Sequence, residues 1–218
     1  MQWEWDGRVY EECVAFHKVN EVVGNLPVGG LPNMSGAFPL TIGGVPVRST
    51  EALYQACRFP HQPDWQREIL AAGNGMQAKM AAKKGQRRKL HTRSDWEKYQ
   101  VDVMRWCLRV KLAQHYRDFF VQLLNWTKQR PIVEHSSKDR FWGAVKGEDG
   151  VLHGANQLGR LLVEVRDNAQ LLRTASREAE LLRVEPLEIP DFLLLGQPIG
   201  VVEAAGRGFT PPQAVPPG

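Results

Sequence analysis

The chain has 218 residues, of which 43% are hydrophobic, and a formal net charge of +4. This length allows one large domain, or one domain with an appendage, and no apolar run approaches the length of a membrane span. The opening MQWEWDG lacks a signal-peptide pattern and the three cysteines are widely spaced, so we expect a cytoplasmic protein with reduced thiols. No histidine or cysteine spacing fits a metal site, and we expect neither metal nor cofactor.

The first third of the chain predicts short strands followed by helices. Residues 9–50 are rich in glycine, proline, valine and threonine, and FPLTIGGVPV predicts a strand, a Gly-Gly turn and a second strand. Ser49 or Thr50 then caps a helix with the body EALYQACRF. DWQREILAAGN and MQAKMAAKKG predict two more helices, the second of which we expect to end at Gly85.

The longest predicted helix runs over residues 95–116 in the middle of the chain. Ser94 and Glu97 have the spacing of a capping box, and two apolar stripes place the helix at the centre of its domain. We expect the helix to continue over 118–126, and PIVE predicts a short strand directly after it.

The carboxyl-terminal part begins with a predicted helix over 156–165. After about residue 168 the pattern changes: QLLRTASREAELLRVE predicts a charged amphipathic helix, and PLEIPDFLLLGQPIGVV an extended strap. We therefore expect an α+β fold, a predominantly helical single domain with short amino-terminal strands and hairpins. Its parts are a domain over 1–168, a helix and strap over 169–203 and a disordered tail over 204–218.

Two acidic side chains are candidates for chemistry. Glu51 lies in the first turn of its helix, where the helix dipole favours an ionised carboxylate, although ordinary first-turn placement explains it equally. Asp139 lies in the loop after the predicted strand, beside Trp142 and Gly143, in HSSKDRFWG. The alternative for Asp139 is an exposed turn acid paired with Arg140.

Three further positions suggest binding of an anionic substrate. The glycine turn in GANQLG, 154–159, leads into a helix whose free N–H groups suit a phosphate, although capping by Asn156 explains the pattern equally. Lys18 lies beside a likely strand, where a lysine is usually a surface residue. Trp96 follows a basic run without acids that could face phosphates, although an ordinary solvated surface explains the run equally, and an indole there can stack on a base. The run comprises Lys79, Lys83, Lys84, Arg87, Arg88, Lys89 and Arg93.

Together these segments resemble one family. HKVNE, LPNMSGAFPL, STEALYQACRFP, AKMAAK, RSDW, VMRWCLRVKLAQH, PIVEHSSKDRFWG and NQLGRLLVEVR occur in the order found in the NADAR (YbiA-like) domain family, over residues 16–166. The long forms STEALYQACRFP and VMRWCLRVKLAQ are most similar to the branch found beside DNA-modifying ADP-ribosyltransferase toxins of the DarT type. The family's site motifs match here at Glu51, Asn33, Gln55, Trp96, Asp139, Trp142, Asn156 and Gly159.

The resemblance implies an N-glycosidase that hydrolyses the bond between a base and ribose. The DarT-associated branch removes ADP-ribose from modified guanine in nucleic acid as an antitoxin, whereas another branch cleaves riboflavin-pathway intermediates. A non-catalytic module that binds ADP-ribose or nucleic acid is a third alternative. The implied binding partner is a nucleotide or DNA. For the DarT-associated branch, the product is ADP-ribose and the functional counterpart is a DarT-like toxin.

The residues take roles under this interpretation. Glu51 or Asp139 would stabilise positive charge on the ribose ring, and Lys18 would protonate the leaving base or attack the opened sugar as an amine. Trp96 and Trp142, with the adjoining Gly143, would form a wall against the base. Asn156 and the helix start would face the pyrophosphate, and Lys79 would hold phosphates.

Overall fold

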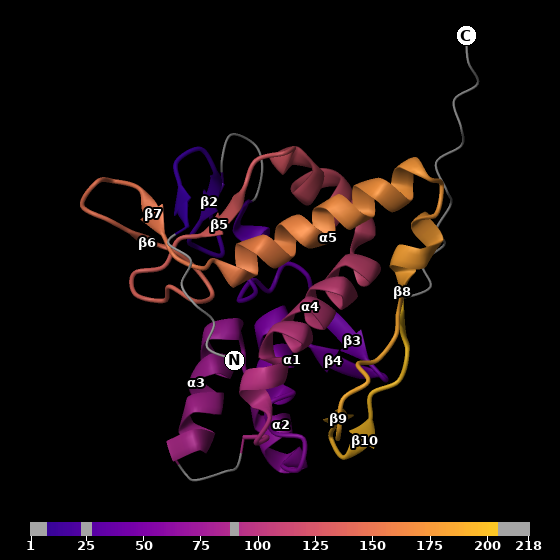
Figure 1. The fold of residues 1–218 in the computed structure, drawn as a ribbon. Coiled ribbons are helices and arrows are strands. Elements are labelled where there is room, and N and C mark those ends of the chain that lie inside the picture. Colours follow the sequence, from indigo (N-terminus) through magenta and orange to yellow (C-terminus); the bar gives the residue numbers. More distant parts are fainter. Residues whose placement is uncertain (1–7, 23–27, 88–91, 205–218) are drawn as a thin grey trace.

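The computed structural model describes residues 8–22, 28–87 and 92–204 (Figure 1). Helices and short strands both contribute, so the expectation of an α+β fold is confirmed. The α-helices are α1 (Thr50–Ala56), α2 (Pro63–Leu70), α3 (Gly75–Arg87), α4 (Trp96–Gln114) and α5 (Gln157–Thr174). The strands are β1 (Val9–Tyr10), β2 (Val14–Phe16), β3 (Leu40–Ile42), β4 (Val45–Val47), β5 (Ile132–Glu134), β6 (Val145–Lys146), β7 (Leu152–His153), β8 (Arg183–Val184), β9 (Leu193–Leu194), β10 (Gln197–Pro198) and β11 (Val202–Glu203).

Helices α4 and α5 pack against each other and form the middle of the molecule. Helices α2 and α3 lie on one side of this pair, with β2 and β5 on the other (Figure 1). The two apolar stripes of α4 explain its place, because Val103, Trp106 and Leu108 are at most 2% exposed. Helix α1 contacts α2, α3 and α4, so its side chains lie among these three helices.

The beginning of α1 follows the sequence prediction. Ser49 is the N-cap, and its hydroxyl accepts the N–H of Ala52 at 3.2 Å. The expected hairpin also forms, with β3 antiparallel to β4. Gly43 and Gly44 make its turn at φ of +54° and +80°, a conformation that favours glycine.

Three helix boundaries differ from the prediction. Helix α3 continues past Gly85 to Arg87, and Gly85 serves packing, because a Cβ there would lie 2.2 Å from the indole Nε1 of Trp65. Asp95 is the N-cap of α4 without a side-chain capping bond, so the predicted capping box does not close. The segment after α4 is a π-helix, η2 (Tyr116–Leu124), followed by the 3₁₀-helix η3 (Asn125–Thr127), rather than a continued α-helix.

The strands form several small pairings rather than one sheet. Strand β2 is parallel to β5, with Phe16 opposite Glu134, and β1, β7 and β6 form a three-stranded sheet in that order. A 3₁₀-helix, η1 (Val28–Gly30), follows β2. Two of the four strands near the amino terminus, β1 and β2, therefore pair with segments more than a hundred residues away, whereas β3 and β4 form a local hairpin.

The carboxyl-terminal part is continuous with the main body. Helix α5 runs through residue 168 and ends at Thr174, so the expected change at 168 falls inside one helix. After the 3₁₀-helix η4 (Glu178–Leu182), β8 pairs with β11 and β9 with β10, in place of a single extended strap. The tail expected to be disordered lies, from residue 205 on, outside the described residues. None of the described helices has the length and apolar character needed to cross a membrane.

Helix α5 approaches β5 unusually closely, and Gly159 makes this possible. A Cβ at Gly159 would lie 1.9 Å from the carbonyl oxygen of Ile132 and 2.5 Å from the amide nitrogen of Asn156. The Ile132 carbonyl belongs to the backbone and the Asn156 side-chain amide is hydrogen-bonded, so neither group can move aside as a flexible side chain would. Gly159 therefore sets the distance between α5 and the strand that ends in Glu134.

We predict that Gly159→Ala lowers the free energy of unfolding by about 1–3 kcal/mol, because the added methyl group must push α5 away from β5. Urea denaturation measures the change. Gly200→Ala is the matched control, since nothing lies within 4 Å of a Cβ at Gly200. An unchanged midpoint for Gly159→Ala would show that α5 moves freely relative to β5.

Candidate active site

One face of α1 carries three polar or aromatic side chains, Glu51, Tyr54 and Gln55, and Glu51 is only 6% exposed. Arg58 follows in the turn directly after the helix. Gln55 Nε2 donates to Glu51 Oε1 at 2.7 Å, and Arg58 Nη1 donates to Gln55 Oε1 at 3.0 Å. This chain of hydrogen bonds fixes the orientation of the Glu51 carboxylate.

The ionisation of Glu51 differs from the expectation based on the helix dipole. Burial raises the pKa of Glu51 above its ordinary value, and the charge of Asp139 raises it further. The hydrogen bond from Gln55 and the charges of Lys79 and Arg58 lower the pKa, but these effects are smaller. Desolvation therefore outweighs the groups that favour the anion.

A second carboxylate comes from the end of β5. Glu134 is half-buried, and burial together with the charges of Asp139 and Glu51 raises its pKa to about 7, against a smaller lowering by Lys79. The backbone of Glu134 is held by Asn156, whose Oδ1 accepts its N–H at 3.0 Å. A carboxyl group with such a pKa can exchange a proton near neutral pH.

The third carboxylate, Asp139, organises the loop that the sequence analysis singled out. Its Oδ1 accepts the N–H groups of Phe141 at 3.0 Å and Trp142 at 2.9 Å, while its own N–H donates to Ser136 Oγ at 2.9 Å. The alternative of an exposed acid paired with Arg140 is wrong, because Asp139 is half-buried and Arg140 donates to the carbonyl of His153 instead.

Glu51, Glu134 and Asp139 thus form one acid cluster, from α1, from the end of β5 and from the loop after β5. The charges of Glu51 and Asp139 both raise the pKa of Glu134, and Lys79 of α3 opposes them. Arg58 acts in the same sense on Glu51. The cluster includes two acids that are 88 positions apart in the sequence, Glu51 and Asp139, and their catalytic roles stay predictions.

The aromatic side chains beside the cluster meet at Tyr54. Its ring lies 5.0 Å from that of Trp96 and 5.6 Å from that of Trp142, centroid to centroid. Arg58 lies over the Trp96 ring at 5.3 Å. Trp96 is 8% exposed whereas Trp142 is half-buried, so Trp142 offers more of its ring to a ligand.

The helix start at Asn156 has a different function from the predicted one. The N–H groups of Asn156, Gln157 and Leu158 donate to the carbonyls of Gly143, Phe141 and Trp142. These donors are therefore occupied, and the expectation that they face a phosphate is wrong. The alternative of side-chain capping is also wrong, because the Asn156 amide instead spans Glu134 and Ile132, donating to Ile132 O at 2.8 Å.

Gly143 and Gly159 belong to the same packing arrangement. A Cβ at Gly143 would lie 2.5 Å from the carbonyl oxygen of Glu134, and one at Gly159 would meet Asn156. Both glycines let the loop and α5 approach β5. They position the acid cluster, and direct contact with a substrate stays a prediction for them.

Asn33 lies behind Glu51. Its carbonyl accepts the N–H of Glu51 at 3.0 Å, and its Nδ2 contacts Met104 Sδ at 2.8 Å. Asn33 Oδ1 is buried without a hydrogen-bond partner among the described residues. Asn33 therefore adjoins the cluster from the segment before α1.

Lys18 lies two positions after Phe16, the residue of β2 that is opposite Glu134 in β5. It is exposed and follows β2, and its backbone N–H donates to Glu21 Oε2 at 3.2 Å. Among the described residues, no hydrogen bond or ion pair joins its ammonium group to the acid cluster. The predicted catalytic role of Lys18 has no supporting contact and stays a prediction.

Sequence reasoning missed Glu134, Tyr54 and Arg58. The signals were present, since PIVE ends a buried strand with an acid, and the other two lie three and seven positions after Glu51 on its helical face. No group of three or more histidine, cysteine, aspartate or glutamate side chains in the described part could hold a metal ion.

This geometry defines an α+β protein with a carboxylate-centred polar site beside two indoles and two cations. The chain belongs to the NADAR domain family, which matches residues 26–170. Its fold is similar to the NMR structure of the Escherichia coli protein YbiA, with a TM-score of 0.59 and 27% identity over 77% of this chain and 90% of that one.

Sequence relatives carry two kinds of name. The N-glycosidase YbiA of Escherichia coli is 33% identical over 131 residues, which are 60% of this chain and 76% of that protein. A riboflavin biosynthesis protein of Vibrio vulnificus is 37% identical over 131 residues, and the matched part is 33% of its length. The chain thus spans about a third of the Vibrio protein.

We predict that Glu134→Gln changes the pH dependence of stability. Because the pKa of Glu134 is higher in the folded protein than in the unfolded chain, the folded protein keeps this proton to a higher pH. The free energy of unfolding of the wild type therefore falls as pH rises from about 4.5 through about 7. The glutamine variant lacks this loss. Its stability relative to wild type should therefore rise by up to about 3 kcal/mol between pH 4 and pH 8.

Urea denaturation at a series of pH values measures this difference. Glu148→Gln is the matched control, because Glu148 is exposed in a turn. A constant difference between Glu134→Gln and wild type across the pH range would contradict the buried position of this carboxyl group.

Proposed function

We propose that the chain is an N-glycosidase that removes ADP-ribose from ADP-ribosylated guanine in DNA. The observation that carries this proposal is the meeting of Glu51, Glu134 and Asp139 beside Tyr54 and Trp142. The family membership and the N-glycosidase relatives support the reaction class. The similarity of STEALYQACRFP and VMRWCLRVKLAQ to the toxin-associated branch supports the substrate and a counterpart of the DarT type.

The acid cluster supplies the electrostatics of the reaction. Cleavage of a ribosyl C–N bond builds positive charge on the sugar ring, and a carboxylate next to the anomeric carbon stabilises that charge. Asp139 is held by two backbone N–H groups, and Glu51 by Gln55, so both present fixed oxygens. One of them stabilises the sugar cation while the other orients water.

Glu134 is the proton donor in this proposal. Its pKa of about 7 leaves a substantial protonated fraction at neutral pH, and the leaving base nitrogen needs a proton as the bond breaks. Water then adds hydroxide to the anomeric carbon and returns the proton to Glu134. Lys18, which has no described contact with the cluster, is a less suitable donor.

The surroundings fit a substrate with phosphates and a base. Trp142 is the more accessible indole and suits stacking on the base. Lys79 lies close enough to influence Glu51 and Glu134, and Lys83 and Lys84 are exposed on the next turn of α3. This helix therefore extends positive charge outward from the acid cluster, in the direction in which a DNA strand would continue.

A second candidate substrate is a riboflavin-pathway intermediate, favoured by the name of the Vibrio relative. The same acid cluster would cleave its C–N bond, but that small molecule gives the lysines of α3 no strand to contact. A non-catalytic binding module is less well supported, because binding alone gives no reason for a carboxyl group with a pKa near neutrality.

We predict that Glu51→Gln and Asp139→Asn each lower the rate of ADP-ribose release by about 100-fold or more, because one change removes the charge that stabilises the sugar cation and the other removes the carboxylate that orients water. Both changes keep the shape of the side chain, so both variants should fold. Release is measured from an oligonucleotide that carries ADP-ribosylated guanine, with Glu148→Gln as control. A riboflavin-pathway intermediate is assayed in parallel, and turnover of that compound alone would refute the DNA substrate.

We also predict that Lys83→Glu with Lys84→Glu weakens the reaction on modified DNA by about tenfold while leaving a modified mononucleoside nearly unaffected. The lysines would contact strand phosphates that the mononucleoside lacks. Lys146→Glu with Arg173→Glu is the charge-matched control, because both residues are exposed elsewhere. An equal loss on both substrates would show that α3 does not contact the strand.

A further inference from the structure

Helix α3 presents two exposed methionine side chains. Met76 and Met80 are 53% and 62% exposed, and because they are four residues apart they form one row on the outer face of the helix. Of the large hydrophobic side chains that are exposed in the described part of the chain, only these two share a helix. A single exposed apolar residue is ordinary, whereas an adjoining pair forms a patch that another molecule can cover.

A row of lysines runs beside the methionines. Lys79 and Lys83 are also four residues apart, and each follows a methionine by three positions, so the two rows are neighbours on the helix surface. Lys83 is exposed and has no carboxylate partner among the described residues. The surface of α3 therefore combines apolar contact area with free positive charge, which suits a partner that has both negative charge and apolar faces, as a nucleic-acid strand has.

The start of α3 is held close to the acid cluster. A Cβ at Gly75 would lie 2.5 Å from the Cα of Met34, so backbone meets backbone there. Met34 follows Asn33, whose carbonyl accepts the N–H of Glu51 at 3.0 Å. Lys79, one turn along α3, lies close enough to influence the ionisation of Glu51. The methionine row thus has a fixed position next to the proposed catalytic site.

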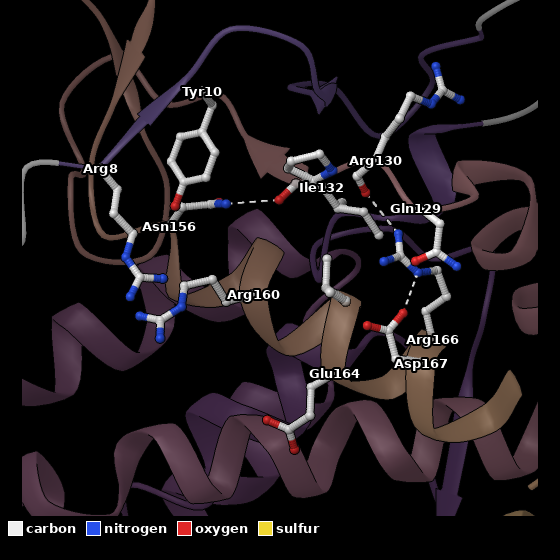
Figure 2. Close-up of a pocket in the computed structure, with 12 residues that line it drawn as sticks. Arg8, Tyr10, Gln129, Arg130, Ile132, Asn156, Arg160, Glu164, Arg166 and Asp167 are labelled. Carbon is white, nitrogen blue, oxygen red and sulfur yellow. Dashed lines mark hydrogen bonds and ion pairs between the residues drawn. The ribbon is translucent and has the colours of Figure 1, made fainter. Parts of the chain in front are cut away.

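Helix α5 closes another side of β5. Figure 2 shows the amide nitrogen of Asn156 directed at the carbonyl oxygen of Ile132, which lies 2.8 Å away. A Cβ at Gly159 would lie 1.9 Å from the same oxygen. A strand attached to a guanine in the acid cluster therefore has no room between α5 and β5, whereas the outer face of α3 is open to it.

We propose that Met76 and Met80 contact the bases that flank the modified guanine in its strand. This inference rests on the proposed glycosidase function and defines its substrate as a strand rather than a free nucleotide. The modified guanine must leave the stack with its neighbours to enter the acid cluster. Methionine is among the residues that proteins insert between bases, and its unbranched side chain adapts to their surfaces.

The double variant Met76→Gln with Met80→Gln tests the contact. We expect kcat/KM to fall about fivefold on a single-stranded oligonucleotide that carries one ADP-ribosylated guanine, and to stay unchanged on the modified mononucleoside. Leucine at both positions keeps the patch apolar and should retain wild-type rates. Leu171→Gln is the matched control, because Leu171 is 67% exposed on α5.

Salt dependence separates the apolar contact from the lysines. We expect the double glutamine variant to keep the wild-type salt slope on the oligonucleotide, whereas Lys83→Gln makes the slope shallower. An unaltered rate of the double glutamine variant on the oligonucleotide would overturn the proposal and leave the patch to a protein partner. An equal loss on oligonucleotide and mononucleoside would also overturn it, because the change would then act on the acid cluster.

Abasic substrates identify the base that is contacted. Two oligonucleotides carry an abasic position directly 5′ or directly 3′ of the modified guanine. We expect the wild type to lose about fivefold on at least one of them, and the double glutamine variant to lose no more there, because its contact is already absent. Losses that add on both substrates would show that the methionines contact neither flanking base.

The mononucleoside distinguishes the two possible failures. Turnover of mononucleoside and oligonucleotide by the wild type, with full activity of the double glutamine variant, would refute this inference alone. A wild type that releases ADP-ribose from neither substrate would refute the proposed function, and this inference with it.

Discussion

The side-chain amide of Asn156 is the interaction on which the candidate site depends. It accepts the N–H of Glu134 and donates to the carbonyl of Ile132, and so it fixes β5 against the start of α5. The residue adopts a left-handed conformation, φ +49°, which asparagine tolerates better than most residues. The N–H groups of the helix start then hold the carbonyls of Phe141 and Trp142, so strand, loop and helix are assembled at one point.

This assembly explains why charged residues stand directly before aromatic residues in HSSKDRFWG. The loop must return from β5 to the start of α5, and Asp139 makes that turn by accepting the N–H groups of Phe141 and Trp142. The turn places the Asp139 carboxylate near Glu51 and the Trp142 ring against Tyr54. The acid thus shapes the loop and contributes charge to the cluster, so a structural role and a chemical role fall on the same side chain.

Local sequence patterns predicted the elements that depend on neighbouring residues. They failed where contacts between distant segments determine the structure. The start of α1, the hairpin at Gly43-Gly44 and the strand PIVE follow from capping, turn and strand chemistry. The end of α3 could not be predicted, because the indole of Trp65 packs against Gly85 inside that helix. In the site, helix position and loop context made Glu51 and Asp139 candidates, and the resemblance to the family matched both. Glu134 stayed hidden because its pKa is raised mainly by burial in the folded protein, which the sequence PIVE alone does not show.

Three neighbouring carboxylates pose a difficulty for any substrate that carries phosphates, because like charges repel strongly in a partly buried site. The fold reduces this repulsion in two ways. Lys79 and Arg58 lie close enough to offset part of the negative charge on Glu51. Burial, with a smaller effect of the charges of Asp139 and Glu51, raises the pKa of Glu134 to about 7, so at neutral pH much of that group is uncharged. The buried position that prepares Glu134 to donate a proton therefore also lowers the negative charge that an anionic nucleotide must approach.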